Sequence, residues 1–159
     1  MLAAIRATDA INVALLVHVL GALLLIGGLV TALAFQYAGW RRERPEDALA
    51  LSRLAFKSLL IVAFPAWIIM RVGAGWVYSK EKIEGTPIED QAWIGIGFIT
   101  AELGGLLLLV SIILAGIGVR KLRTGGGSIS TLMRISTVLV TLLVLAYIVA
   151  VWAMGAKPE

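Results

Sequence analysis

Four long apolar stretches, separated by charged connections, constrain the fold of this chain more than any other feature. Each stretch can cross roughly 30 Å of hydrocarbon as a helix that rises about 1.5 Å per residue. Hydrophobic residues make up 60% of the 159 residues and charged residues only 15%, so little chain remains for a water-soluble domain. The sequence predicts an all-α integral membrane four-helix bundle, with a single domain over residues 1–159 and spans at 11–39, 59–78, 93–119 and 135–155.

The charges predict how this bundle is oriented in the membrane. The connection at 79–92 carries four acidic residues against two lysines, whereas basic residues gather on the two other connections: Arg41, Arg42, Arg44, Arg53 and Lys57 on one, and Arg120, Lys121, Arg123 and Arg134 on the other. By the positive-inside rule, we expect two basic cytoplasmic loops, with the N and C termini and the acidic connection outside. The net charge of +4 then reflects topology, and we expect a multi-pass protein of the inner (plasma) membrane with no nucleic-acid partner.

Prolines mark where the second helix starts and where it is interrupted. Pro45 precedes Glu46 and Asp47, a favourable first turn for a helix that begins on the cytoplasmic side. Pro65 lies inside the apolar stretch and lacks the N–H of a helical hydrogen bond, so we expect a kink near 61–65. The first apolar stretch is too long for a signal peptide and is followed by basic residues, so we interpret it as a retained helix.

Small residues repeat every seven positions along two of the spans and predict where helices meet. Such stripes let backbones approach closely, which matters because lipid gives no hydrophobic drive for association between helices. The third span carries a second small-residue face that also includes Glu102, so we expect this helix to contact two neighbours. The stripes are Ala14, Gly21 and Gly28 in the first span, Gly97, Gly104, Ser111 and Gly118 in the third, and Gly95, Gly105 and Gly116 on its second face.

Several polar side chains of different spans are predicted to lie at one depth in the outer half of the bilayer. Arg71 lies roughly 10 Å inside Tyr78, and Glu102 lies roughly 14 Å inside Trp93. An ionised side chain at such a depth costs roughly 3 kcal/mol or more unless it has a partner, water or a task. We therefore expect a polar cluster or ligand-binding site that combines Arg71 and Glu102 with three neighbours at similar levels: His18, Trp67 and Tyr147.

Two interpretations of this cluster stay open at the level of sequence. In the first, Arg71 and Glu102 form an ion pair that joins the second and third helices, while His18 donates to a backbone carbonyl or to Glu102. In the second, the cluster is a small site open to the outside, in which Arg71 holds an anion, Glu102 exchanges a proton, and His18 binds a metal or titrates.

A haem group is a further candidate ligand of His18. The chain has no cysteine, which excludes thiolate metal sites and iron–sulfur clusters. It has one histidine, so two imidazole ligands would require two chains. Met70 lies at a depth similar to that of His18 and offers a thioether, so His18 and Met70 are the candidate cofactor-binding pair for a haem b. Five-coordinate ligation by His18 alone is the alternative.

The first two spans resemble a loose superfamily of small bacterial membrane proteins. The resemblance rests on His18 followed by Gly27, Gly28 and Leu29, and on AFPAWIIMRVGAGW at 63–76. The superfamily includes integral membrane proteins of unknown function and is similar to copper-resistance-D-like proteins and to the J-type protoporphyrinogen oxidase. For the oxidase, the resemblance implies a first-helix histidine associated with haem. This chain has Leu25 where a tryptophan is usual and no lysine in a later span, which favours the family of unknown function.

Three functional hypotheses follow from these features. No nucleophile stands beside a histidine base and there is no nucleotide loop, so an enzyme is the less favoured class. The favoured hypothesis is an accessory or structural subunit of a membrane complex, with the lipid bilayer, other membrane subunits or a second copy as partners that bind through the glycine stripes. The alternatives are a haem-binding or quinone-linked redox membrane protein that uses His18, and a proton or small-anion carrier or sensor.

Overall fold

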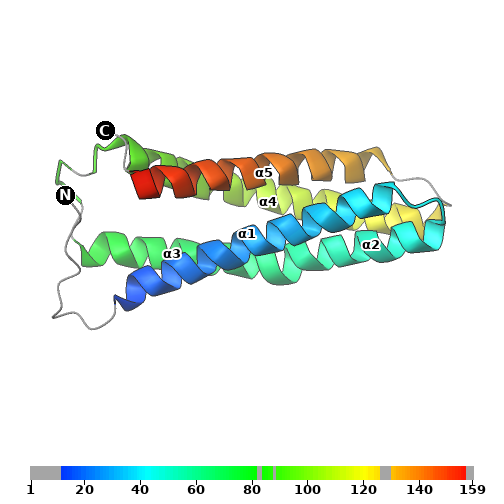
Figure 1. The fold of residues 1–159 in the computed structure, drawn as a ribbon, viewed down its shortest axis with the longest axis horizontal. Coiled ribbons are helices and arrows are strands. Elements are labelled where there is room, and N and C mark those ends of the chain that lie inside the picture. The colour runs from blue at the N-terminus through cyan, green and yellow to red at the C-terminus, as the bar shows by residue number, and fades with distance from the viewer. Residues whose placement is uncertain (1–11, 82–83, 88, 126–129, 157–159) are drawn as a thin grey trace.

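The fold is an all-helical bundle of four membrane-spanning segments, as predicted. The structure is a computed structural model that describes residues 12–81, 84–87, 89–125 and 130–156. Within these ranges no strand is present, and the helices are α1 (Val13–Trp40), α2 (Pro45–Lys57), the π-helix η1 (Ser58–Ala63), α3 (Phe64–Lys80), α4 (Ala92–Thr124) and α5 (Thr131–Ala156) (Figure 1). Four candidate spans result, because α2, η1 and α3 form one continuous helix over Pro45–Lys80. The predictions of the all-α class and of a membrane helical bundle are confirmed.

The bundle has two chemically different ends. The beginning of α1, the end of α5 and the connection between α3 and α4 lie at one end, which we call the acidic end (Figure 1). The end of α1 and beginning of α2, and the end of α4 and beginning of α5, lie at the opposite end, which carries Arg41, Arg44 and Arg123 and which we call the basic end. The acidic end therefore corresponds to the side that the charge distribution predicts to be outside.

The second span begins where Pro45 predicts and changes its winding ahead of Pro65. Pro45 is at the first position of α2, and the acidic residues expected in that first turn are present. The Phe64 N–H donates to the carbonyl of Leu59, five residues earlier, within the π-helical turn. A proline cannot make the next helical hydrogen bond, and a wider turn accommodates the missing donor. A π-helical segment thus stands where a kink was expected, and the helix extends well beyond the apolar stretch on its N-terminal side.

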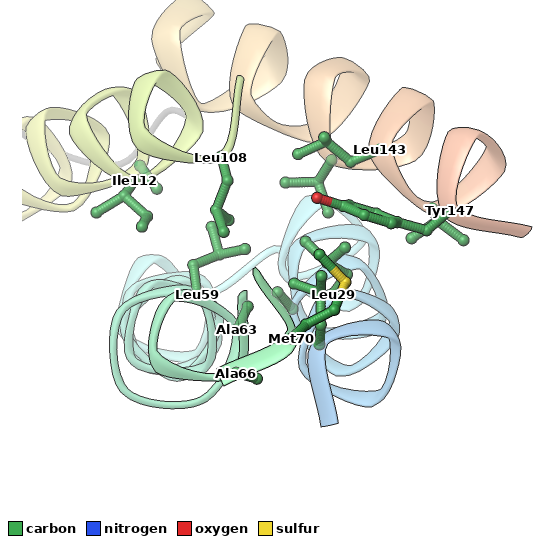
Figure 2. Packing of buried hydrophobic residues seen from close by; sticks show 14 of the residues in the cluster. Leu29, Leu59, Ala63, Ala66, Met70, Leu108, Ile112, Leu143 and Tyr147 are labelled. Carbon is green, nitrogen blue, oxygen red and sulfur yellow. The ribbon is translucent and has the colours of Figure 1, made fainter. Parts of the chain in front are cut away.

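The buried core is narrow and lies between all four spans. Leucines of α1, η1, α4 and α5 meet there, with Leu29, Leu59, Leu108 and Leu143 fully or almost fully buried (Figure 2). Many other large apolar side chains remain exposed along the outer faces of the helices. A membrane-spanning bundle has this pattern because its outer surface contacts acyl chains.

Glycines set the distance between α1 and α3. A Cβ at Gly73 would lie 2.6 Å from the backbone nitrogen of His18, and a Cβ at Gly21 would overlap the backbone of Met70. A Cβ at Gly28 would lie 3.0 Å from the nitrogen of Ala63, the last residue of η1, which continues into α3. The two helices therefore touch backbone to backbone, and the stripe predicted in the first span is confirmed as a packing seam. Gly73, the matching position on α3, was not predicted.

Glycines also seat large side chains on two faces of α4. On the α5 side, a Cβ at Gly104 would lie 2.6 Å from the Tyr147 hydroxyl, and on the other side a Cβ at Gly105 would overlap the Trp67 indole. The prediction that this helix contacts two neighbours is confirmed. Most of the small-residue stripes are thus occupied by neighbouring helices of the same chain.

Candidate functional site

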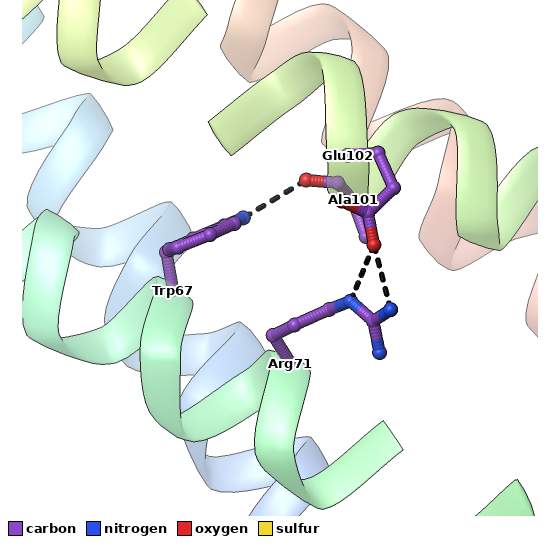
Figure 3. A network of polar contacts seen from close by, with 4 residues as sticks. All are labelled: Trp67, Arg71, Ala101 and Glu102. Carbon is purple, nitrogen blue, oxygen red and sulfur yellow. Dashed lines mark hydrogen bonds and ion pairs between the residues drawn. The ribbon is translucent and has the colours of Figure 1, made fainter. Parts of the chain in front are cut away.

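Arg71 and Glu102 form the ion pair that links α3 to α4. The Arg71 Nε donates to Glu102 Oε1 over 2.7 Å, and Arg71 Nη2 lies 2.6 Å from the same oxygen (Figure 3). The exposed fraction of the side chain is 33% for Arg71 and 59% for Glu102. The pair therefore lies on the outer surface of the bundle between two helices, rather than in the core.

Trp67 adds a second bond between the same two helices. Its Nε1 donates to the backbone carbonyl of Ala101 over 2.9 Å, one turn deeper than the ion pair (Figure 3). The indole reaches this carbonyl because Gly105, against which it packs, has no side chain. Two successive turns of α3 thus hold two successive residues of α4, and Trp67 is a neighbour of the pair, as predicted.

His18 makes its hydrogen bond between α1 and α3, away from the ion pair. Its Nδ1 lies 3.0 Å from the backbone carbonyl of Met70, in the seam between α1 and α3 where the imidazole is half-buried. A carbonyl only accepts hydrogen bonds, so Nδ1 is the donor in this contact. Of the two partners considered for His18, the structure shows a backbone carbonyl and not Glu102.

The contact between α1 and α3 opposes a haem held by His18 and Met70. The backbones of these two residues lie directly against Gly73 and Gly21, respectively, of the opposite helix. A porphyrin with both ligands would have to lie between their side chains, where the helices already touch. The Met70 side chain instead lies in the buried core. In the part of the chain that the structure describes, no three His, Cys, Asp or Glu side chains are grouped as metal ligands around His18 or elsewhere.

Tyr147 is buried apart from the ion pair. Its exposed fraction is 4%, and its hydroxyl points into the bundle above Gly104 (Figure 2). The hydroxyl has no hydrogen-bond partner among the described residues. The expected polar cluster is therefore divided in three: Trp67 with Arg71 and Glu102, His18 with Met70, and Tyr147 alone.

A pocket of about 540 Å³ opens at the acidic end beside the ion pair. We call it the rim pocket, and its lining includes Arg71, Gly75 and Tyr78 of α3, Glu89 of the connection, and Gly95 and Phe98 of α4. The guanidinium carbon of Arg71 lies 5.5 Å from the centre of the Phe98 ring, which meets the Tyr78 ring edge-on. Sequence reasoning did not identify Glu89 or Phe98, because neither belongs to a motif and their proximity depends on how the connection folds back.

Hydrogen bonds hold Glu89 at the mouth of the rim pocket. The Tyr78 hydroxyl donates to Oε1 over 2.6 Å, and the Gly85 N–H donates to Oε2 over 2.7 Å. These two donors stabilise the ionised form and hold the pKa of the Glu89 carboxyl below its ordinary value of 4.5. The ionised Glu89 carboxylate therefore links the connection to Tyr78 of α3.

This anchor predicts a pH dependence of the connection. Because the pKa of Glu89 is lowered in the folded state, its stabilising contribution is complete above the ordinary value of 4.5 and is lost as the pH falls further. We expect the hydrogen-exchange protection of the Gly85 amide, corrected for the intrinsic rate, to stay constant down to about pH 5 and then to decline. In Tyr78→Phe the folded-state pKa of Glu89 should lie closer to 4.5, so the protection at neutral pH should be lower and the decline smaller. Equal protection at about pH 3 and pH 7 would contradict the anchor.

A second polar chain, which sequence reasoning missed, lies nearer the basic end. The Gln36 side chain donates from Nε2 to Ser136 Oγ over 3.3 Å, and the Ser136 hydroxyl donates to the carbonyl of Ser111 over 2.9 Å. Gln36 is 1% exposed, so these bonds join α1, α5 and α4 inside the bundle. Its one signal in the sequence is a lone amide within an apolar stretch.

Comparison with known proteins adds no relative. No protein-family model matches this chain, and neither a curated protein nor a solved structure matches it. The resemblance of the first two spans to small bacterial membrane proteins stays a prediction. A functional proposal therefore depends on the described residues of this chain. Its four long apolar helices fit a membrane helical-bundle protein.

Proposed function

We propose that this protein is an accessory or structural subunit of a membrane complex and that it binds a partner helix across the α3–α4 face. The observation that supports this role is the position of Glu102. Its side chain is 59% exposed, although it lies roughly 14 Å inside Trp93 along α4. A charged side chain that faces acyl chains at this depth costs roughly 3 kcal/mol, so membrane proteins cover such groups with protein or water.

The ion pair leaves half of the Glu102 carboxylate for such a partner. Both contacts of Arg71 with Glu102 fall on Oε1, and no described residue donates to Oε2. An ionised carboxylate accepts several hydrogen bonds. A transmembrane helix that carries a lysine, serine, threonine or asparagine at the level of Glu102 would supply the missing donor.

Three other polar groups of the spans bond to the backbone of a neighbouring helix, which also favours a structural role. His18, Trp67 and Ser136 each make a hydrogen bond to a backbone carbonyl of a neighbouring helix. These bonds hold the bundle together.

A small-anion sensor is the second candidate, because one guanidinium nitrogen of Arg71 faces the rim pocket. A Cβ at Gly75, which lines this pocket, would lie 3.8 Å from Arg71 Nη1. The redox hypothesis has no comparable support, since His18 and Met70 do not leave space for a porphyrin between them.

Photo-crosslinking in native membranes tests the subunit role. A photoreactive residue at position 106, one turn after Glu102 and on an exposed face, should give one protein adduct in fixed stoichiometry, whereas position 145 on α5 should give mainly lipid adducts. Glu102→Gln should abolish the adduct at 106 while the variant still elutes as a folded bundle. A chain that is monomeric in native mass spectra, with no protein adduct at 106, would contradict the proposal.

A further inference from the structure

The deep end of the rim pocket presents a cationic donor. Arg71 uses Nε and Nη2 for Glu102, so the N–H groups of Nη1 are directed elsewhere. Nη1 lies beside Gly75, one turn nearer the acidic end than the Arg71 backbone, and the missing side chain at Gly75 leaves it open to the pocket. Long basic side chains commonly reach toward the interface in this way. A phosphate or carboxylate in the pocket would be recognised by this nitrogen.

The mouth of the rim pocket has the opposite character. Glu89 is ionised and exposed, and each of its oxygens retains acceptor capacity beyond its one hydrogen bond to Tyr78 or Gly85. Tyr78 lies next to it, and the Phe98 ring, which also lines the pocket, meets the Tyr78 ring edge-on with ring centres 5.5 Å apart. A carboxylate beside aromatic rings favours an ammonium group, through an ion pair and through cation–π attraction.

The order of these two ends matches that of a phospholipid in the outer leaflet. Arg71 lies roughly 10 Å inside Tyr78, so an anionic group would lie deep and an ammonium group would lie outward, toward Glu89. Exposed apolar side chains flank the ion pair on both helices, including Val72 on α3 and Ile99 and Leu103 on α4, and would contact acyl chains. The volume of about 540 Å³ is in the usual range for a ligand pocket.

We propose that the rim pocket binds a zwitterion of the phosphoethanolamine type, with the phosphate on Arg71 Nη1 and the ammonium against Glu89 and the aromatic pair. Its source is the headgroup of phosphatidylethanolamine in the outer leaflet. This site is independent of the proposed partner contact, which depends on Glu102 Oε2.

Native mass spectrometry of the delipidated full chain tests the site. We expect phosphatidylethanolamine to bind about tenfold more tightly than phosphatidylglycerol with the same acyl chains, since only the former carries an ammonium group for Glu89. Glu89→Gln should remove this preference. Gly75→Leu and Gly95→Leu fill the pocket and should abolish binding, whereas Gly27→Leu should bind as the unaltered chain does. Gly27 is a matched control because it is an exposed helical glycine whose Cβ would have no neighbour within 4 Å.

The outcomes separate the ligand, its source and the partner contact. Equal affinities for the two lipids, or Gly75→Leu and Gly95→Leu that bind as Gly27→Leu does, would overturn the proposal. Competition by free phosphoethanolamine at the affinity of the lipid would support the zwitterion site but contradict the lipid as its source. Absence of a protein crosslink at position 106 in the otherwise unaltered chain, with lipid binding intact, would refute only the partner contact.

Discussion

Gly73→Ala should lower the free energy of unfolding by about 3 kcal/mol, because its methyl group has no space between α1 and α3. A Cβ there would lie 2.6 Å from the nitrogen and 2.7 Å from the Cα of His18. These are backbone atoms, which cannot rotate away as a side chain can. The helices would have to separate, which would also break the hydrogen bond between His18 and the Met70 carbonyl. Reversible unfolding in mixed detergent micelles measures this loss.

Gly27→Ala is the matched control for this experiment. Gly27 lies on α1, and a Cβ there would have no neighbour within 4 Å. Alanine has a higher helix propensity than glycine, so this variant should be as stable as the unaltered chain or more stable by up to about 1 kcal/mol. Equal stabilities of Gly73→Ala and Gly27→Ala would show that α1 and α3 do not touch at His18.

Arg71→Met should destabilise the bundle by about 2 kcal/mol, since it leaves the Glu102 carboxylate unpaired at membrane depth. Arg71→Met removes both contacts on Glu102 Oε1, at 2.7 and 2.6 Å, but leaves the negative charge of Glu102 in place. Glu102→Gln should cost less, about 1 kcal/mol, because the Arg71 side chain can extend to the acidic end. The same unfolding measurement provides the values.

The double variant Arg71→Met with Glu102→Gln distinguishes pairing from separate effects. With both charges removed, no unpaired ion remains in the span, and we expect a stability within about 1 kcal/mol of the unaltered chain. If the costs of the two single variants simply add, the two side chains do not depend on each other and the pair does not join α3 to α4.

The sequence by itself determined the spans and which faces of the helices pack. Hydrophobic length defines a membrane helix, and a repeat of small residues defines a face, because both follow from the regular rise and turn of the helix. The pairing of Arg71 with Glu102 was also foreseeable, since two opposite charges at one depth on adjacent helices have few other partners.

Only the tertiary structure decided which groups meet across the seams. The backbone of His18 packs against Gly73, and its Nδ1 donates to the backbone carbonyl of Met70. Every residue has such a carbonyl, so no sequence pattern identifies which one is the acceptor. The hydroxyl of Tyr147 faces Gly104 rather than the ion pair, and Glu89 returns to Tyr78 through the connection. These contacts depend on the distance and rotation between neighbouring helices, which periodicity along a single helix does not contain.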